Sequence, residues 1–177
     1  MRLVLLSCCA PCGAGAIKQL ADGQIPDVDD FIVLFFNPNI YPFEEYQKRM
    51  AEQIRYCDML GVGHATLEYD HDAWRAAVRG METAPERGAR CSACFEFRFA
   101  RAAAWARENG YDAVASVLGV SRHKDQTQVD NAGTATCKNG VCYVPIKWDE
   151  GLRQQIGRAS DFYRQNYCGC EFSIRKV

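Results

Sequence analysis

Short apolar runs alternate with longer amphipathic segments along the chain. Residues 3–6 and 31–36 are continuous apolar runs, a pattern typical of strands buried on both faces of a parallel sheet. Residues 43–60 carry apolar side chains every three or four positions and are followed by Gly61, which predicts a helix and its end. Strands that alternate with helices of this length predict an α/β fold in three layers, with a mainly parallel sheet and helices on both faces.

The rest of the chain continues this alternation without a linker or an internal repeat. We predict further strands over residues 64–69, 111–117 and 142–146. We predict further helices over residues 14–21, 70–80, 94–108, 121–132 and 149–165, with Ser121 as the N-cap of the fourth. A length of 177 residues suits one domain, so we expect residues 1–177 to form a single domain.

The composition favours a soluble globular protein. Hydrophobic residues make up 48%, charged residues 24%, and the formal net charge is −1, so any contact with nucleic acid needs a local basic patch. The apolar stretch at residues 3–6 is shorter than the roughly 7–15 residues of a signal-peptide core, and no run approaches the roughly 18 apolar residues of a membrane span. We therefore expect a cytoplasmic protein without membrane contact, in which cysteines stay reduced.

Seven of the ten cysteines fall into three short groups. The groups are Cys8, Cys9 and Cys12; Cys91 and Cys94; and Cys168 and Cys170. The first follows the strand at residues 3–6, where Pro11 and Gly13 predict a turn, and the second lies at the amino end of a predicted helix. Thiolates this close in sequence can converge on one metal, and open α/β sheets bind ligands at the carboxyl ends of their strands. The pattern predicts a metal site, with Cys57, Cys137 and Cys142 outside it.

Three other interpretations use fewer of these cysteines. A structural zinc site needs four ligands, usually two pairs joined by a short loop, whereas more than 70 residues separate the groups here. A thioredoxin-like motif over residues 9–12 would leave five clustered cysteines without a role, and disulfides are unexpected in a reducing compartment. Seven thiolates fit better an iron–sulfur cluster with four ligands beside a second metal with three, and the sequence leaves the partition open.

Further motifs accompany the cysteines in order along the chain. They are Asn37-Pro38-Asn39-Ile40-Tyr41-Pro42 with Glu45 and Arg49, Glu86-Arg87-Gly88-Ala89-Arg90 before Cys91 with Arg98 after it, Ser121-Arg122-His123-Lys124, and Tyr167 before Cys168-Gly169-Cys170-Glu171. Together with Ser7-Cys8-Cys9-Ala10-Pro11-Cys12 they resemble the epoxyqueuosine reductase family QueH over nearly the whole chain. The expected fold is then of the Rossmann-like, adenine-nucleotide-hydrolase-like type.

Members of that family are cobalamin-independent and carry an iron–sulfur cluster with a neighbouring iron. The resemblance implies that the chain reduces the epoxide of epoxyqueuosine in tRNA to queuosine, the last step of queuosine biosynthesis. The implied cofactors are a [4Fe-4S] cluster and an adjacent mononuclear iron. The implied metal ligands are Cys8, Cys9, Cys12, Cys91, Cys94, Cys168 and Cys170. The implied partners are tRNA carrying epoxyqueuosine in the anticodon and an unidentified electron donor.

Removing an epoxide oxygen takes two electrons and two protons, and a cofactor must supply the electrons because side chains do not. A cluster delivers electrons singly, and an adjacent iron can act as a Lewis acid. The candidate proton donors are Tyr41, Glu45, His123 and Lys124. The candidate substrate contacts are polar or aromatic side chains of the same motifs: Asn37, Asn39, Arg49, Arg90, Arg98, Ser121, Arg122 and Tyr167.

Two other functions fit parts of the pattern. A cluster-containing tRNA-thiolating enzyme of the ATP-pyrophosphatase type would keep the fold, but it needs a glycine-rich phosphate loop where residues 7–12 read Ser-Cys-Cys-Ala-Pro-Cys. An iron–sulfur electron-transfer protein would use the cysteines without any tRNA. The sequence leaves open the electron donor, the proton donor and the oligomeric state.

Overall fold

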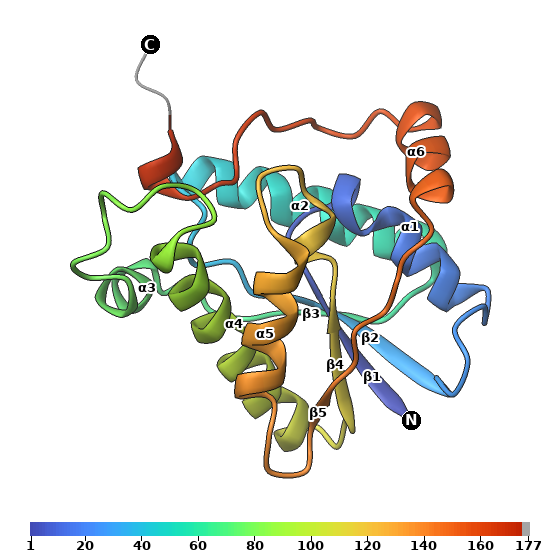
Figure 1. Ribbon diagram of the computed structural model, residues 1–177. Coiled ribbons are helices and arrows are strands. Elements are labelled where there is room, and N and C mark those ends of the chain that lie inside the picture. Colours follow the sequence, from blue (N-terminus) through green and yellow to red (C-terminus); the bar gives the residue numbers. More distant parts are fainter. Residues whose placement is uncertain (175–177) are drawn as a thin grey trace.

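Five strands form one parallel sheet in the order β3-β2-β1-β4-β5 (Figure 1). The computed structural model describes residues 1–174. The central strand is β1 (Arg2–Ser7), with β2 (Asp30–Phe35) and β4 (Ala113–Ser116) beside it. The edge strands are β3 (His64–Thr66) and β5 (Cys142–Tyr143).

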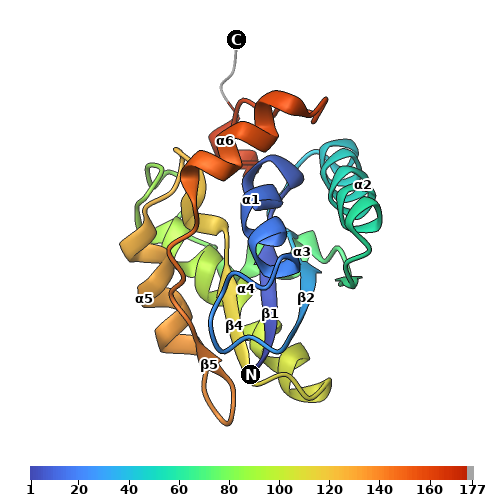
Figure 2. The same ribbon diagram turned by 90° about the vertical axis from the view of Figure 1, so that its right-hand side faces the viewer.

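Helices cover both faces of this sheet, and Figure 2 looks onto the face that the first helix covers. One face packs against α1 (Ala10–Ala21) and α2 (Phe43–Leu60), and the other against α4 (Ala89–Glu108) and α5 (Gln126–Thr136). The short helix α3 (His71–Ala77) contacts α4, and α6 (Glu150–Ala159) contacts α1. The 3-10 turns are η1 (Leu118–Val120) and η2 (Glu171–Ser173). The predicted three-layer α/β fold is confirmed.

The two faces of β1 belong to different halves of the core. Leu3 and Leu5 are fully buried against α1 and α2, whereas Val4 and Leu6 are fully buried against α4 and α5. Side chains alternate across a strand, so a strand covered on both sides requires apolar residues at successive positions. Each buried side chain of this size contributes about 1.5–3 kcal/mol. The core thereby holds the end of β1, where the first cysteines follow.

Two predicted helix starts are wrong by a few residues. The helix α1 begins at Ala10 rather than at residue 14, because Pro11 is favourable in the first turn, where its missing N–H has no partner to lose. The helix α4 begins at Ala89 rather than at residue 94, so Cys91 lies within the helix as well as Cys94. The prediction for α2 is confirmed at both ends, and Gly61 ends it with φ of 65°.

Other elements are shorter than predicted. Ser121 does not cap α5; Asp125 does, accepting a hydrogen bond from the backbone N–H of Gln128 at 2.8 Å. The strand β3 stops at Thr66, because it pairs with β2 and β2 ends at Phe35. The strands β4 and β5 also span fewer residues than predicted. The helix α6 ends at Ala159 rather than at residue 165, because the chain turns there to cross the sheet edge.

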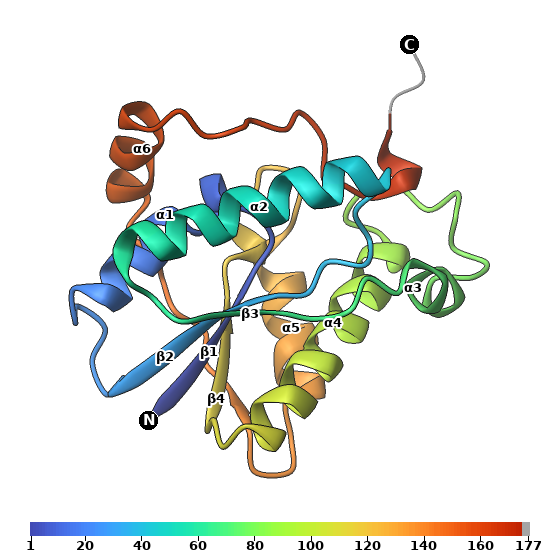
Figure 3. The same ribbon diagram turned by 180° about the vertical axis from the view of Figure 1, so that it is seen from behind.

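The carboxyl ends of β1 and β4 meet at the point where the strand order reverses. The chain runs outward from β1 through β2 to β3, then returns to β4 on the other side of β1. Ligands of open α/β sheets bind at such a switch point. Figures 1 and 3 show residues 160–174 crossing this edge from α6 toward α3 and the start of α4. Every helix within residues 1–174 is too short or too polar to cross a membrane.

Candidate metal centre

Three cysteine sulfurs meet at the junction of β1 and α1. The Sγ atoms of Cys8, Cys9 and Cys12 all lie within 4.8 Å of one another, and those of Cys8 and Cys9 are 3.9 Å apart. Cys9 is the N-cap residue of α1 and Cys12 lies in its first turn, so the change from strand to helix brings the three thiols together. We call these residues the first cysteine group.

Negative charge is stabilised within the first cysteine group. Hydrogen bonds with Cys12 and Cys9 lower the pKa of Cys8 well below its usual value, and the ammonium group of Lys124 acts in the same direction. The contacts with Cys8 and Cys9 raise the pKa of Cys12. The free backbone N–H groups at the start of α1 also favour a thiolate there. The group therefore offers three soft sulfur ligands, with the thiolate favoured at Cys8, and such ligands suit a thiophilic metal ion.

The other four predicted ligands form a second cysteine group at the start of α4. Cys91 and Cys94 lie in α4, and Cys168 and Cys170 arrive on the C-terminal segment. Cys94 and Cys170 are buried in one apolar cluster, against which Cys168 packs. Burial raises the pKa of Cys91, and the charges of Cys168 and Cys94 raise it further. Within residues 1–174 no three of these sulfurs lie within 4.8 Å of one another, so this group is wider than the first.

Arg49 and Glu45 fasten the C-terminal segment to α2. The buried Arg49 donates from Nε to Glu45 Oε1 at 2.7 Å and from Nη1 to the carbonyl of Cys168 at 3.1 Å. Tyr163 donates from its hydroxyl to Glu45 Oε2 at 2.7 Å. Gly169 has φ of 105°, and a Cβ there would lie 2.9 Å from Arg49 Nη1. The structure thus places Arg49 and Glu45 behind the second cysteine group, where they position its backbone.

Tyr41 and Tyr167 belong to the same contact. The backbone N–H of Tyr41 donates to the carbonyl of Gly169 at 2.9 Å, and the hydroxyl of Tyr167 donates to the carbonyl of Tyr41. The Tyr167 ring also lies over the guanidinium of Arg49, with 5.2 Å from Cζ to the ring centroid. The side chain of Tyr41 itself is 43% exposed.

A buried chain of hydrogen bonds links the two cysteine groups. Arg98 of α4 is fully buried and donates from Nε to the carbonyl of Phe36 at 3.2 Å and from Nη2 to Asn37 Oδ1. Asn37 donates from Nδ2 to the carbonyl of Ser7 at 2.9 Å, one residue before Cys8. Two predicted substrate contacts, Arg98 and Asn37, therefore tie the helix of the second group to the strand that ends at the first.

Replacing Arg98 by methionine should lower the free energy of unfolding by about 3 kcal/mol, because two buried oxygen acceptors lose their charged donor. Equilibrium unfolding in urea measures the change. Arg101→Met is the matched control. Arg101 lies on the same helix α4 and pairs with Glu68 at the surface. Its replacement should lower the free energy of unfolding by less than about 1 kcal/mol. Equal losses in the two variants would contradict this role for Arg98.

Two more predicted substrate contacts are buried. Asn39 is 2% exposed and Arg90 is 3% exposed. Arg90 donates from Nη1 to the carbonyl of Glu82 at 2.8 Å, and its guanidinium lies over the ring of Phe172 with 5.5 Å from Cζ to the centroid. Arg90 thereby connects the loop before α4 with the C-terminal turn η2, and so it helps to position the two segments that carry the second cysteine group.

Lys124 lies between the two cysteine groups. Its side chain is almost completely buried. Burial alone would lower its pKa, but the negative charges of Cys8 and Cys168 raise it. The ammonium group of Lys124 thus lies near sulfurs of both cysteine groups.

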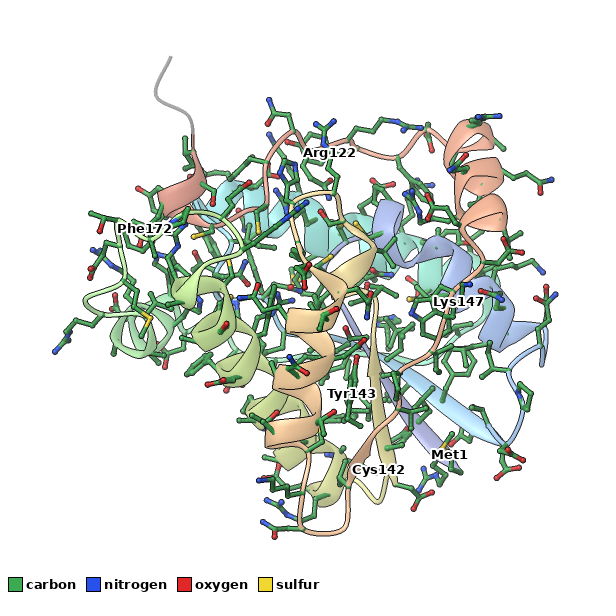
Figure 4. The ribbon with its side chains drawn as sticks, in the orientation of Figure 1. Met1, Arg122, Cys142, Tyr143, Lys147 and Phe172 are labelled. Atoms are coloured by element: carbon green, nitrogen blue, oxygen red, sulfur yellow. The ribbon has the colours of Figure 1, made fainter. Side chains whose placement is uncertain are left out.

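The rest of the turn before α5 faces outward. Ser121 Oγ accepts a hydrogen bond from the backbone N–H of His123 at 3.3 Å, which stabilises the turn. The half-buried His123 has Nδ1 3.5 Å from the carboxylate of Glu86. Arg122 is exposed, and Figure 4 shows it on the same side of the molecule as the C-terminal segment.

A cavity of about 840 Å³ opens beside the cysteines and is lined by Cys8, Cys12 and Cys168. Its walls also hold five basic residues that come from four separate segments. They are Arg49, Arg122, Lys124, Arg153 and Arg164. Asp125 and Glu150 also line the cavity, so its basic side chains outnumber its acidic ones, and this excess favours an anionic substrate.

Sequence reasoning missed three residues of this site. Arg153 and Arg164 line the cavity, and the Nε2 of Gln165 lies 2.7 Å from Cys9 Sγ. The pattern after residue 149 predicts one continuous helix, which would carry Gln165 away from β1. The basic residues of this stretch were the sequence feature that could have indicated a binding role. Such a feature does not show where the segment lies in the fold.

Comparisons with known proteins agree on one family. The family model described as "Epoxyqueuosine reductase QueH" matches residues 3–176. The epoxyqueuosine reductase QueH of Histophilus somni is 39% identical over 180 residues, which cover 98% of this chain and 72% of the relative. That of Acinetobacter baylyi is 38% identical, with 98% and 81% covered.

One solved structure shares the fold. It is the U34-tRNA thiolase NcsA from Methanococcus maripaludis with its [4Fe-4S] cluster, at a TM-score of 0.61 and 14% sequence identity. The match covers 98% of this chain and 61% of the thiolase chain. At this identity the likeness supports the adenine-nucleotide-hydrolase-like fold alone.

Proposed function

The chain belongs to the epoxyqueuosine reductase QueH family, and we propose that its two cysteine groups and the basic cavity between them form the centre at which epoxyqueuosine in tRNA is reduced. As a member of that family the chain is an oxidoreductase that acts in the final step of queuosine biosynthesis. The observation that carries the proposal is the convergence of seven thiols from three distant stretches at one edge of the sheet.

The spacing of the sulfurs supports two metal centres of different kinds. Three sulfurs within 4.8 Å of one another suit a single ion that keeps room for another ligand. A [4Fe-4S] cluster binds each thiolate through a different iron, so its ligands stand farther apart. We therefore assign the cluster to the second cysteine group and the mononuclear iron to the first. When bound, these metals would supply the electrons and a Lewis acid for the epoxide oxygen.

Lys124 is the proton donor that the geometry favours. Its ammonium group lines the cavity between the cysteine groups, as does the neighbouring His123. Glu45 is instead engaged by Arg49, and the side chain of Tyr41 points to the surface. Since the oxygen leaves as water, it takes up two protons, and a side chain at the cavity wall must deliver at least one of them while solvent supplies the other. We assign that delivery to Lys124 Nζ, with His123 as the alternative.

The basic wall of the cavity suits the phosphates of a tRNA anticodon loop. A tRNA that neutralises these side chains with its phosphates releases counterions, and its affinity then falls with salt. Bases of a loop can leave the stack and enter a pocket, which brings a modified base to the cysteines. The exposed Arg122 at the rim is the residue best placed to hold the backbone outside.

Arg122→Glu should weaken tRNA binding and reduce the slope of log affinity against log salt by about one or more. Filter binding at several salt concentrations measures both. The control is Arg107→Glu, an exposed arginine in the last turn of α4 at the opposite edge of the sheet, which should keep the wild-type slope. An unchanged slope in the Arg122 variant would remove this turn from the interface.

Turnover without ATP or cobalamin tests the proposed function directly. The anaerobic protein, supplied with a low-potential reductant and tRNA carrying epoxyqueuosine, should produce queuosine. Mass spectrometry of the digested tRNA should show the loss of one oxygen. No conversion by protein that holds its full iron and sulfide would overturn the proposal.

The rival function is tRNA thiolation driven by ATP. The first loop argues against it, because Cys8, Cys9 and Pro11 occupy the turn where a thiolase of this fold would need glycines around a phosphate. A product that gains sulfur, and that forms only with ATP, would support the rival function.

A further inference from the structure

Trp74 is the largest side chain in the buried apolar cluster beside the second cysteine group. It is fully buried and packs with Val78, Cys94 and Cys170. The helix α3 brings it there, and α3 contacts α4, which carries Cys94. An indole at this position borders two of the four proposed cluster ligands.

The N–H group of this indole lacks a partner. Trp74 Nε1 is buried and makes no hydrogen bond within the described residues. Such an unpaired donor costs about 1–3 kcal/mol, and buried tryptophan N–H groups usually find an acceptor. Elsewhere the chain follows that rule, because Trp148 donates to the carbonyl of Ser116 at 2.9 Å. The orphaned N–H of Trp74 therefore points to a hydrogen bond that forms only when the second cysteine group holds its ligand.

Within this apolar cluster, the sulfur of Cys94 is the candidate hydrogen-bond acceptor for the Trp74 N–H. Trp74 and Cys94 are buried in the same apolar cluster, and the helices α3 and α4 that carry them contact each other. Two rings hold the indole in its place, since the ring centroids of His71 and Phe172 lie 5.2 Å and 6.0 Å from that of Trp74. His71 is itself fixed by a hydrogen bond between Nδ1 and the carbonyl of Pro38 at 2.6 Å.

We propose that Trp74 donates a hydrogen bond from Nε1 to the Cys94 sulfur in the cluster-bound protein and thereby raises the reduction potential of the cluster. The inference rests on the proposed function, which assigns Cys94 to the cluster. Reduction adds one electron to the cluster, and an N–H donor to a ligand sulfur stabilises the more negative, reduced form. A cluster with this bond accepts its electron from a weaker reductant than a cluster without it.

Trp74→Phe removes the N–H group and keeps an aromatic ring at the same buried position. The anaerobically reconstituted full chain should hold as much iron and sulfide as wild type, and its cluster should be reduced at a more negative potential. A potentiometric titration followed by electron paramagnetic resonance measures the shift. Trp105→Phe is the control, because Trp105 stacks on Tyr111 at the other end of α4 and should leave the potential unchanged. Equal potentials in wild type and Trp74→Phe, both with full clusters, would overturn the proposal.

A second measurement tests the same hydrogen bond in a protein that keeps Trp74, so that it still decides the question if Trp74→Phe does not fold. In the reduced Trp105→Phe protein, labelled with ¹⁵N in its indole rings, the cluster should show hyperfine coupling to an indole nitrogen. Trp148 cannot supply it, because its N–H bonds to Ser116 on the opposite face of the sheet. A spectrum without this coupling would overturn the proposal. A full cluster without turnover would contradict the proposed function alone, and wild-type protein that binds no sulfide would refute both.

Discussion

Replacing Cys94 by serine should abolish the iron–sulfur cluster and the reductase activity together. A serine hydroxyl stays protonated and is a hard oxygen donor, whereas the cluster needs a soft thiolate at that position. Even changes to groups that only support a metal ligand cost 10–100-fold, so the loss of a ligand should reduce turnover by more than about 100-fold. Iron and sulfide analysis of anaerobically purified protein, with turnover of tRNA carrying epoxyqueuosine, measures both effects.

Cys57→Ser is the matched control, because it makes the same chemical change at another buried cysteine, one outside both cysteine groups. Cys57 lies on α2 in the core half that faces α1, and its sulfur accepts a hydrogen bond from Gln53 Nε2 at 3.6 Å. Burial raises its pKa to about 11, so it stays a neutral thiol. The variant should keep its iron and its activity. Loss of iron from Cys57→Ser, or a full cluster in Cys94→Ser, would contradict the assignment of ligands.

Cys8→Ser should separate the two metal centres. This variant should keep the sulfide and the spectrum of the four-iron cluster, because the second cysteine group is intact. It should lose one iron per chain and more than about 100-fold of its turnover, since Cys8 belongs to the first cysteine group and lines the cavity. Iron and sulfide counts, the spectrum of the reduced cluster and the tRNA assay together give the answer.

Cys142→Ser is the control for this second experiment. Cys142 is exposed and lies at the opposite end of the molecule, where Figure 4 labels it beside Tyr143. It should match wild type in iron, sulfide and turnover. If Cys8→Ser lost its sulfide and kept no cluster, the partition would be reversed, and the first cysteine group would hold the cluster.

Sequence alone determined the elements whose cause is local. The apolar run of β1 requires cover on both faces, and the spacing along α2 with Gly61 after it sets that helix to the residue. These features depend on residues that are close in sequence, so the pattern of residues along the chain is sufficient to predict them. The order of such elements then determined the α/β class, because parallel strands need crossover helices.

The sequence also indicated part of the chemistry. Cysteines within five residues of one another are necessarily close in space. Cys8, Cys9 and Cys12 therefore indicated a candidate metal-binding group before any fold was known. The motifs around them were sufficient to indicate the family. Spacing says nothing, however, about which distant groups meet.

Only the tertiary structure brought Cys168 and Cys170 to Cys91 and Cys94, more than 70 residues away in sequence. The prediction of a helix through residue 165 was wrong because helix propensity is a weak local preference. The chain leaves the helix at Ala159, where packing across the sheet edge outweighs that preference.

The roles of the charged residues were decided in the same way. Arg49, Arg90 and Arg98 look like solvent-facing contacts in a list of residues, but the fold buries them against backbone carbonyls around the cysteines. A buried charge is tolerated only where its donors are satisfied, and those acceptors come from elements far apart in the chain. Sequence therefore indicated which kind of chemistry this protein contains, and the tertiary structure decided which residues line the cavity and which hold them in place.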